Sequence, residues 1–219
     1  MRVAVVNEVS AAQRNADIMA ALQGRELELL NVGMTRVGPD QPALTYIHTG
    51  FLSALLLNSG RADFIVAGCG TGQGFEISVS QYPGVFCGHI VTPLDAWLFA
   101  RINGGNCASL PLNQGYGWAA EVNLGIVFDQ LFTVERSSGY PESRKASQQQ
   151  SRDILAAVSA ASHRKMAEIV LSLPDDVVRP ALAFPGVWDL LDSDTLTDRM
   201  LAEAISRRGA DLGVRSAPA

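Results

Sequence analysis

The feature that most constrains the fold of this chain is the alternation of short, continuous apolar runs with longer helical patterns. Strands that are apolar on both faces and alternate with helices are typical of a parallel sheet covered on two sides. We therefore expect an α/β protein, a Rossmann-like three-layer α/β/α sandwich with a five-stranded parallel sheet. The five runs predicted as strands are residues 3–6, 27–32, 63–68, 84–91 and 106–112.

The composition changes in the second half of the chain, where a polar stretch with glycine and proline follows the last apolar helix. Residues 1–134 contain all five predicted strands and are interpreted as a complete core. Residues 135–219 are predicted to form a helical extension that begins with one long helix, at about 146–172. We expect Phe184 and Trp188 to pack this extension onto the core. The alternative is that it covers a neighbouring subunit's site or builds a dimer interface.

Composition and charge argue against several classes of partner. The formal net charge of -5 gives no electrostatic reason to expect nucleic acid or an anionic membrane. The N-terminal apolar run is too short for a signal peptide, and no run reaches the roughly 18 apolar residues of a membrane span. Three cysteines without a C-x-x-C pair indicate neither a disulfide framework nor a zinc site. We expect a cytoplasmic protein without a metal or cofactor.

The stretch "VAGCGTGQGFE" at residues 66–76 follows the third predicted strand directly and leads into a helix. Its glycines alternate with other residues, at Gly68, Gly70, Gly72 and Gly74. Glycine permits positive φ and lets a ligand approach the backbone closely. Successive N–H groups and the positive end of a helix dipole favour negative charge. The stretch therefore predicts an anion-binding loop, and the alternative is a tight turn that binds nothing.

A glycine loop that binds S-adenosylmethionine or a dinucleotide is a further alternative. Such a loop usually follows the first strand, with an acidic residue before it and another about 20 residues later. Here Val66 and Ala67 precede the motif, and two strand–helix units come before it. The first acid after the next strand is Asp95, which a helix cap explains equally well. The dinucleotide fingerprint also fails, because the third glycine arrives one residue early, at Gly74.

Cys69 gives the loop a possible chemistry. A thiol beside stacked N–H groups and a helix N-terminus lies in a setting that favours the thiolate. A thiolate next to an oxyanion hole can remove a proton from a carbon beside a carbonyl while the N–H groups hold the enediolate oxygen. That is the chemistry of aldose–ketose isomerisation. The alternative for Cys69 is a small buried hydrophobe, which is the favoured interpretation of Cys87 and Cys107 inside their apolar strands.

Two further motifs follow the glycine loop. After "GCGTGQG" come "YPGV" at residues 82–85 and "INGGN" at 102–106. This series resembles the ribose-5-phosphate isomerase B and galactose-6-phosphate isomerase family, whose pattern is C-G-T-G-x-G, then P-G-[IV], then H-N-D-A-N. In the third motif Asn103 and Asn106 match, and the spacing between the motifs needs no gap. The resemblance covers roughly residues 1–145.

The resemblance implies a role for several residues. Cys69 corresponds to the family's proton-transferring base, and Thr71 to a hydroxyl that assists ring opening or holds a substrate oxygen. The loop glycines correspond to the enediolate cradle, and Asn103 to a ligand of sugar hydroxyls. The implied substrate is a small sugar or sugar phosphate. Because the family assembles as dimers with active sites at the subunit interface, the resemblance also implies a homo-oligomer.

The sequence departs from the family pattern at four places, one of which is near Asn113, where the family has an arginine after its fifth strand. Where the family has Cys-Asp-His after its first strand, this chain has "NEV" at residues 7–9, so that Glu8 replaces the aspartate and the histidine is missing. Ile102 stands in place of the histidine of H-N-D-A-N. Of the basic C-terminal stretch that clamps phosphate, only Arg144 and Lys145 remain as candidates.

The remaining substrate-binding candidates are Glu8, at the end of the first strand, His48, at the start of the second long helix, and Arg144. His89, inside the fourth predicted strand, is interpreted as structural, and Glu76 as a carboxylate favoured by the helix dipole. The missing histidines leave a second hypothesis open, a catalytically retired protein that binds a sugar or sugar phosphate without converting it.

Overall fold

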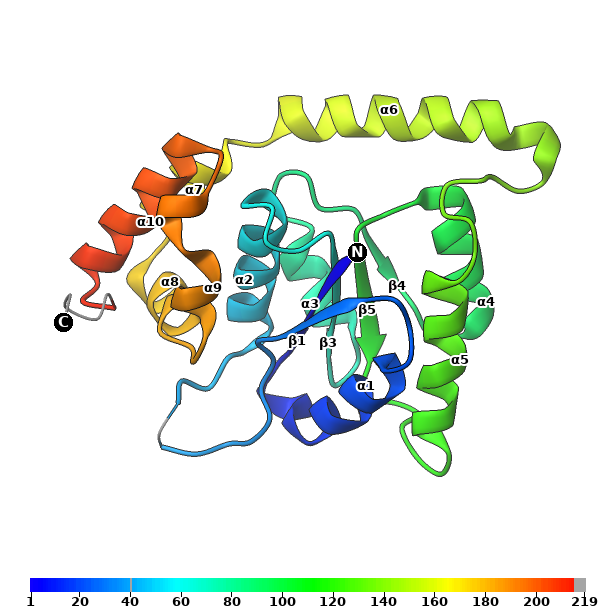
Figure 1. Ribbon diagram of the computed structural model, residues 1–219, viewed down its shortest axis with the longest axis horizontal. Helices are drawn as coiled ribbons and strands as arrows, with labels where there is room; N and C mark the ends of the chain where they lie inside the picture. The colour runs from blue at the N-terminus through cyan, green and yellow to red at the C-terminus, as the bar shows by residue number, and fades with distance from the viewer. Residues whose placement is uncertain (40, 215–219) are drawn as a thin grey trace.

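One sheet lies at the centre of the molecule. The computed structural model describes residues 1–39 and 41–214. All neighbouring strands are parallel, and their order is β2-β1-β3-β5-β4 (Figure 1). The predicted α/β fold with a five-stranded parallel sheet is therefore confirmed. The strands are β1 (Arg2–Asn7), β2 (Glu28–Asn31), β3 (Phe64–Cys69), β4 (Cys87–His89) and β5 (Cys107–Pro111).

Helices cover both faces of the sheet, because each central strand is apolar on both sides. In β1, Val3 and Val5 face one layer, and Ala4 and Val6 face the other. The first layer contains α1 (Asn15–Leu22), α4 (Pro93–Leu98) and α5 (Ala120–Phe132), and the second contains α2 (Tyr46–Asn58) and α3 (Gln73–Val79). A 3-10 helix, η1 (Val9–Arg14), follows β1, and a π-helix, η2 (Phe99–Asn103), extends α4.

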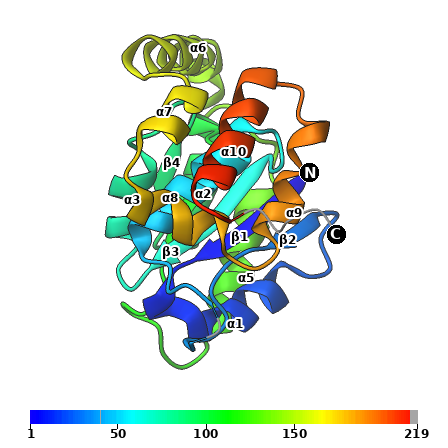
Figure 2. The ribbon, with the colours of Figure 1, turned by 90° about the vertical axis from the view of Figure 1, so that its left-hand side faces the viewer.

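The C-terminal part of the chain is helical, as predicted. Helix α6 crosses the amino end of the sheet, and the helices after it pack beside α2 (Figures 1 and 2). Phe184 is buried, and Trp188 packs against the same core cluster, so both side chains attach the extension to the core as expected. The elements are η3 (Glu142–Arg144), α6 (Lys145–Ser162), α7 (Met166–Ser172), α8 (Asp175–Leu182), α9 (Val187–Leu191), η4 (Ser193–Thr195) and α10 (Arg199–Asp211).

The single long helix expected over residues 146–172 is wrong. The chain leaves the helix at His163, whose backbone is extended, and α7 begins three residues later. The break turns the chain toward the core, so that Met166 and Val170 are buried there. The burial of these two side chains provides a packing reason for the break. Helix α6 itself is largely exposed. No helix in the described part of the chain is long and apolar enough to cross a membrane.

Candidate active site

The glycine loop lies at the carboxyl edge of the sheet, near the middle of the strand order. β3 is flanked by β1 and β5, and Cys69, its last residue, is aligned with Pro111 of β5. Residues 70–72 then lead into α3. The loop is therefore placed where parallel α/β sheets present their ligand sites, at the carboxyl ends of the strands.

Cys69 is a free thiol that is held firmly beside the loop. Its side chain belongs to the core cluster on the α2 face and is only 6% exposed. Its backbone carbonyl accepts a 3.0 Å hydrogen bond from the N–H of Leu112, which ties the end of β3 to the chain after β5. The thiol is thus fixed at the point where the strand ends and the loop begins.

The backbone N–H groups of residues 70–74 determine what chemistry the loop can perform. In the part of the chain that the structure describes, none of them donates a hydrogen bond to a protein acceptor. The carbonyl of Gly70, in contrast, accepts from the N–H groups of Asn113 and Gln114 at 3.0 and 2.8 Å. Because the first N–H groups of a helix have no partner within it, they are available to a bound anion. The loop can therefore stabilise a developing negative charge.

Gly72 must be glycine at this position. Its φ is +77°, and a Cβ here would lie 2.5 Å from Cε1 of His89 and 3.0 Å from the carbonyl carbon of Leu110. The Ser109 hydroxyl donates a 2.6 Å hydrogen bond to the Gly72 carbonyl. His89 at the end of β4 and Ser109 in β5 together fix the shape of the loop. The packing of His89 against Gly72 is compatible with the structural role predicted for it, and its Nδ1 lies 3.9 Å from a carboxylate oxygen of Glu76.

The other two loop glycines differ in what surrounds them. A Cβ on Gly74 would lie 3.3 Å from the ring of Tyr46, the first residue of α2. A Cβ on Gly70 would meet only Ser10 and Asn113, at 3.5 and 3.6 Å. Close approach therefore favours glycine at position 74, whereas a Cβ at position 70 would make only ordinary contacts with its two polar neighbours. Thr71 lies between these glycines and is exposed.

Glu8 lies in the same region of the carboxyl edge. Its N–H donates to the carbonyl of Gly68 at 3.3 Å, and its side chain is buried. The Ser10 hydroxyl donates to the Glu8 carboxylate, and the side chain of Asn113 donates to the Ser10 carbonyl at 2.9 Å. The structure thus brings together Glu8, Ser10 and the residues next to Gly70.

Asn7, which stands where the family has cysteine, supports this region from behind. Its side-chain amide donates to the carbonyls of Ala11 and Met34, at 2.9 and 2.8 Å. Asn15 donates in turn to the Asn7 side-chain oxygen, at 2.7 Å. These bonds join the end of β1 to η1 and to the loop after β2, so they hold Glu8 in place.

His48 has a structural environment. Its Nδ1 accepts a 2.9 Å hydrogen bond from the N–H of Thr45 and so caps α2. Its Nε2 lies 2.9 Å from the carbonyl oxygen of Asp176 in α8. Nδ1 is therefore used in capping α2, and Nε2 in attaching the extension to the core. This arrangement argues for a structural role in place of the substrate contact expected from the sequence.

Asn103 and Arg144 lie at the other end of the sheet. The N–H of Ile65 donates to the carbonyl of Asn106, so the segment around Asn103 precedes β5 at its amino end. A strand advances by about 3.3 Å per residue, so the four steps from Ile65 to Cys69 alone span about 13 Å. Within one chain, Asn103 and Arg144 are thus separated from Cys69 by the length of the sheet.

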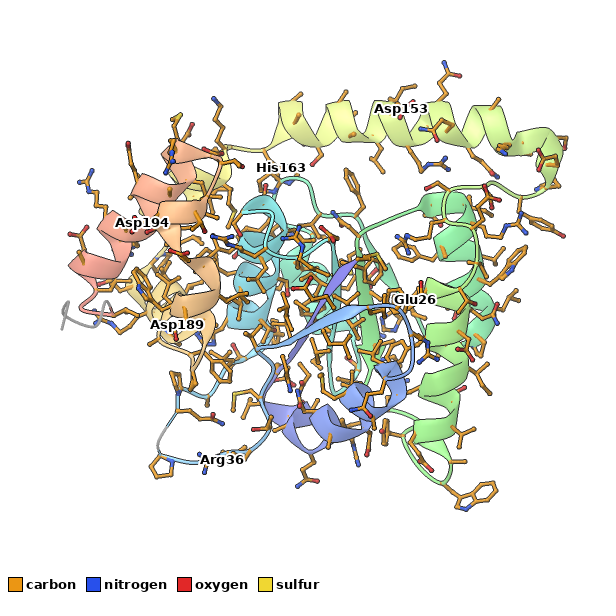
Figure 3. The ribbon with its side chains drawn as sticks, in the orientation of Figure 1. Glu26, Arg36, Asp153, His163, Asp189 and Asp194 are labelled. Atoms are coloured by element: carbon orange, nitrogen blue, oxygen red, sulfur yellow. The ribbon has the colours of Figure 1, made fainter. Side chains whose placement is uncertain are left out.

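Asn103 and Arg144 share a cavity of about 950 Å³ beneath α6. Cys87 and Phe99 lie on its core side, and both polar and apolar side chains of α6 line it from the opposite side. Asp153 and His163, which also line it, are labelled on this helix and at its end in Figure 3. The residues predicted from the sequence therefore fall into two groups, one at each end of the sheet.

Three site residues were missed by reasoning from sequence. Ser10, Tyr46 and Asn113 come from three different segments and meet only around the loop. Asn113 follows a strand directly, which is a position that favours function in parallel sheets. Ser10 and Tyr46 carry no comparable signal, because their distance from the loop depends on how η1 and α2 pack.

Within the described part of one chain, the hydrogen bonds and ion pairs of residues 8–10 and 69–74 involve no positively charged side chain. Among the described residues, no group of three or more His, Cys, Asp or Glu side chains could hold a metal ion. The chemistry on hand is therefore a thiol, a carboxylate, hydroxyls, amides and backbone N–H groups.

Comparisons with known proteins agree with this geometry. A family model described as Ribose/Galactose Isomerase matches residues 3–124. A ribose-5-phosphate isomerase structure from Vibrio parahaemolyticus is similar, with 37% identity and a TM-score of 0.88, covering 95% of this chain and 99% of that one. A 4-deoxy-L-threo-5-hexosulose-uronate ketol-isomerase complexed with a tartrate has 32% identity, the same TM-score and the same coverage.

A more distant structure, the type B ribose 5-phosphate isomerase of Trypanosoma cruzi, shares the fold at 16% identity with a TM-score of 0.61. The match covers 74% of this chain and 98% of that chain. The first two structures therefore match a larger share of the present chain than this one does. No curated protein sequence matches the chain.

Proposed function

Because this chain belongs to the ribose/galactose isomerase family, we propose that it is an intramolecular oxidoreductase that interconverts an aldose and a ketose. Its substrate is a small sugar or sugar phosphate, and the reaction passes through a cis-enediolate. One observation supports the proposal above all others. The Cys69 thiol ends the strand from which the unpaired N–H groups of residues 70–74 follow, so a base and an oxyanion hole lie side by side.

The proposed reaction begins on the open-chain aldose. The Cys69 thiolate removes the proton from C2, and the negative charge passes to the carbonyl oxygen O1, where the loop N–H groups stabilise it. The Cys69 thiol then returns the proton to C1, while the hydroxyl proton of O2 moves to O1. The product is the ketose, and no atom is gained or lost.

The residues around Gly70 are placed to handle the oxygen-bound protons. The Ser10 hydroxyl, hydrogen-bonded to Glu8, faces the space beside Gly70. We assign the O2-to-O1 proton movement to this pair, because a carboxylate with a bound hydroxyl can accept and donate a proton in turn. The exposed Thr71 hydroxyl would hold a substrate oxygen, and the ring of Tyr46 would form a wall of the site.

A second copy of the chain would complete the site. Asn103 and Arg144 lie too far from Cys69 to contact the same small sugar within one chain. In a two-fold dimer each copy can place these side chains against the other copy's glycine loop, which gives two equivalent sites. Arg144 would then supply the positive charge that the loop lacks.

Exposed apolar side chains on α6 support association, and two of them, Leu155 and Val158, also line the cavity beneath the helix. Ile154, Leu155 and Val158 are each more than half exposed, and they lie on the same long helix. An exposed apolar patch of this kind marks a protein interaction surface more often than a solvated one. We propose that the second copy covers these side chains, so that the extension contributes to the subunit interface.

Two candidate substrates differ in their acidic group, which is a phosphate in one and a carboxylate in the other. The similar Vibrio structure is a ribose-5-phosphate isomerase, and the other close structure acts as a uronate ketol-isomerase. A phosphate normally requires several cations, whereas a carboxylate is satisfied by one arginine fork or by neutral donors. Because no lysine or arginine is hydrogen-bonded to the glycine loop among the described residues, a sugar acid is a second candidate substrate.

Proton exchange tests whether the protein is a catalyst or a retired binding protein. The wild-type protein is incubated in D₂O with ribose 5-phosphate, galactose 6-phosphate, the unphosphorylated sugars and a 5-hexosulose uronate. NMR then follows the loss of the C2 proton and the appearance of the isomer. We expect both with at least one of these sugars. A sugar that binds by calorimetry without any exchange of its C2 proton would favour the binding protein.

A further inference from the structure

Two cysteines that the proposed reaction does not use lie side by side in the sheet. β4 and β5 are parallel neighbours, and their register aligns Cys87 with Cys107. Aligned residues of parallel strands point to the same face, and neighbouring strands are about 4.8 Å apart. A disulfide requires Cα atoms roughly 4.4–6.8 Å apart. The backbone spacing therefore permits a bond between these two sulfurs.

The Cys107 thiol is buried beside the Cys87 side chain. Burial raises the pKa of the Cys107 thiol well above its ordinary value, and a hydrogen bond with the Cys87 side chain acts in the same direction. Both side chains are free thiols. Cys69 is not within reach. On β3, the neighbour of β5, Ile65 is aligned with Cys107 and Cys69 lies four residues further along, a separation of about 13 Å.

Only one member of the pair is accessible. Cys107 is completely buried, whereas Cys87 is half-buried and lines the cavity of about 950 Å³ beneath α6. A small oxidant that enters this cavity meets Cys87 first. Cys107 is then the only neighbouring thiol that can reach the oxidised sulfur.

The pair is connected to the glycine loop through both strands. His89 lies two residues after Cys87, and its ring packs against Gly72. Ser109 lies two residues after Cys107 and donates to the Gly72 carbonyl. Side chains two residues apart on a strand share a face. Any shift of β4 against β5 therefore reaches Gly72 along two routes.

We propose that Cys87 and Cys107 form an oxidation-sensitive dithiol that controls the shape of the glycine loop. Hydrogen peroxide, the oxidant, converts the Cys87 thiol to a sulfenic acid and leaves as water. The Cys107 thiol attacks that sulfur, a second water leaves, and a disulfide joins β4 to β5. Two thiols lose two protons and two electrons to one peroxide. The effect on turnover rests on the proposed function, whereas bond formation does not.

Mass spectrometry tests the bond without reference to activity. In a Cys69→Ser variant only Cys87 and Cys107 remain as thiols. Peroxide is expected to lower its intact mass by about 2 Da, to remove both titratable thiols and to give a linked peptide that dithiothreitol separates. The matched control, Cys69→Ser with Cys87→Ser, keeps one thiol and forms no link. A Cys69→Ser protein that gains oxygen on Cys87 while Cys107 stays titratable would overturn the proposal.

NMR tests the connection to the loop in the same Cys69→Ser protein. We expect the amide resonances of Gly70, Thr71 and Gly72 to shift on oxidation and to return on reduction, while those of the distant α10 stay in place. Unchanged loop resonances in a fully cross-linked protein would overturn the regulatory part. Both measurements can be interpreted even if no sugar proves to be a substrate. Failure of the dithiol proposal and failure of the proposed function are therefore distinguishable.

Discussion

The Ser109 hydroxyl donates a 2.6 Å hydrogen bond to the carbonyl oxygen of Gly72, and the bond joins the buried centre of β5 to the glycine loop. Ser109 is completely buried, so water cannot replace it. With the ring of His89 packed against the same glycine, the loop is held by the end of β4 and the centre of β5. The loop is therefore a preorganised part of the sheet edge, as an oxyanion hole requires.

Replacing Ser109 with alanine should loosen the loop. We expect Ser109→Ala to lower the free energy of unfolding by about 1 kcal/mol and turnover by roughly tenfold. Ser53→Ala is the matched control, because Ser53 is equally buried but its hydroxyl has no hydrogen-bond partner among the described residues. It should leave stability unchanged or raise it. Urea unfolding and steady-state rates measure both, and equal effects of the two substitutions would contradict the account.

Gly72→Ala tests the close packing of the loop. The new methyl group would meet His89 and the backbone of Leu110 in a backbone conformation with φ of +77°. We expect turnover to fall by about 100-fold or more, because the N–H groups would be displaced. Gly24 has nearly the same φ, +78°, with no atom near its Cβ position. Gly24→Ala should therefore cost only the strain, about 1–2 kcal/mol, and keep full activity.

Mixing two inactive variants tests whether two copies share a site. A Cys69→Ala protein and an Asn103→Ala/Arg144→Ala protein each lack one half-site. After denaturation and joint refolding in equal amounts, random pairing should restore about a quarter of the wild-type activity, since each mixed dimer has one intact site. Sedimentation must show a dimer or larger assembly. A mixture that stays inactive, or a wild-type protein that is an active monomer, would show that one chain supplies the whole site.

The fold could be predicted from sequence because its signals are local. All five strands were found, and each lies within, or within one residue of, a predicted run, although β4 occupies only Cys87–His89 of the run predicted at 84–91. The break between α6 and α7 was missed, because no glycine or proline marks it. It follows from the packing of Met166 and Val170 against the core, which is a tertiary effect.

The site could be predicted only where its residues are contiguous. Cys69 and the loop form one segment, so a single motif placed them at the carboxyl edge. His48 was assigned to the substrate because its helix starts near the loop, but its ring is engaged by Thr45 and Asp176, and the contact with α8 depends on the extension. Ser10 and Tyr46 needed the packing of separate segments.

The ion pair between Arg2 and Asp63 predicts one source of acid sensitivity. A hydrogen bond from the Arg2 guanidinium, 2.8 Å long, is the main cause that lowers the pKa of Asp63 below its ordinary value of 3.8. The stabilisation is therefore fully present above that value and is lost as the pH falls through the lowered pKa of the folded state. Because the pair is partly exposed, we expect it to contribute less than about 1 kcal/mol.

Asp63→Asn removes this contribution. The variant should be slightly less stable than the wild type at pH 7, and the two proteins should converge as the pH falls toward 2. Urea unfolding over this range measures the difference. Asp194→Asn, which removes an exposed carboxylate without an ion pair among the described residues, should show no such convergence. A constant difference between Asp63→Asn and the wild type at all pH values would refute the linkage.

The central claim is that the Cys69 thiol transfers the proton. The most direct measurement is the rate at which the C2 proton of the best substrate exchanges with D₂O, in wild type, Cys69→Ala and Cys87→Ala. We predict that Cys69→Ala lowers this rate by about 100- to 10,000-fold while its circular dichroism and melting temperature stay those of a folded protein, and that Cys87→Ala exchanges normally. A Cys69→Ala protein that exchanges the proton at the wild-type rate would contradict the mechanism.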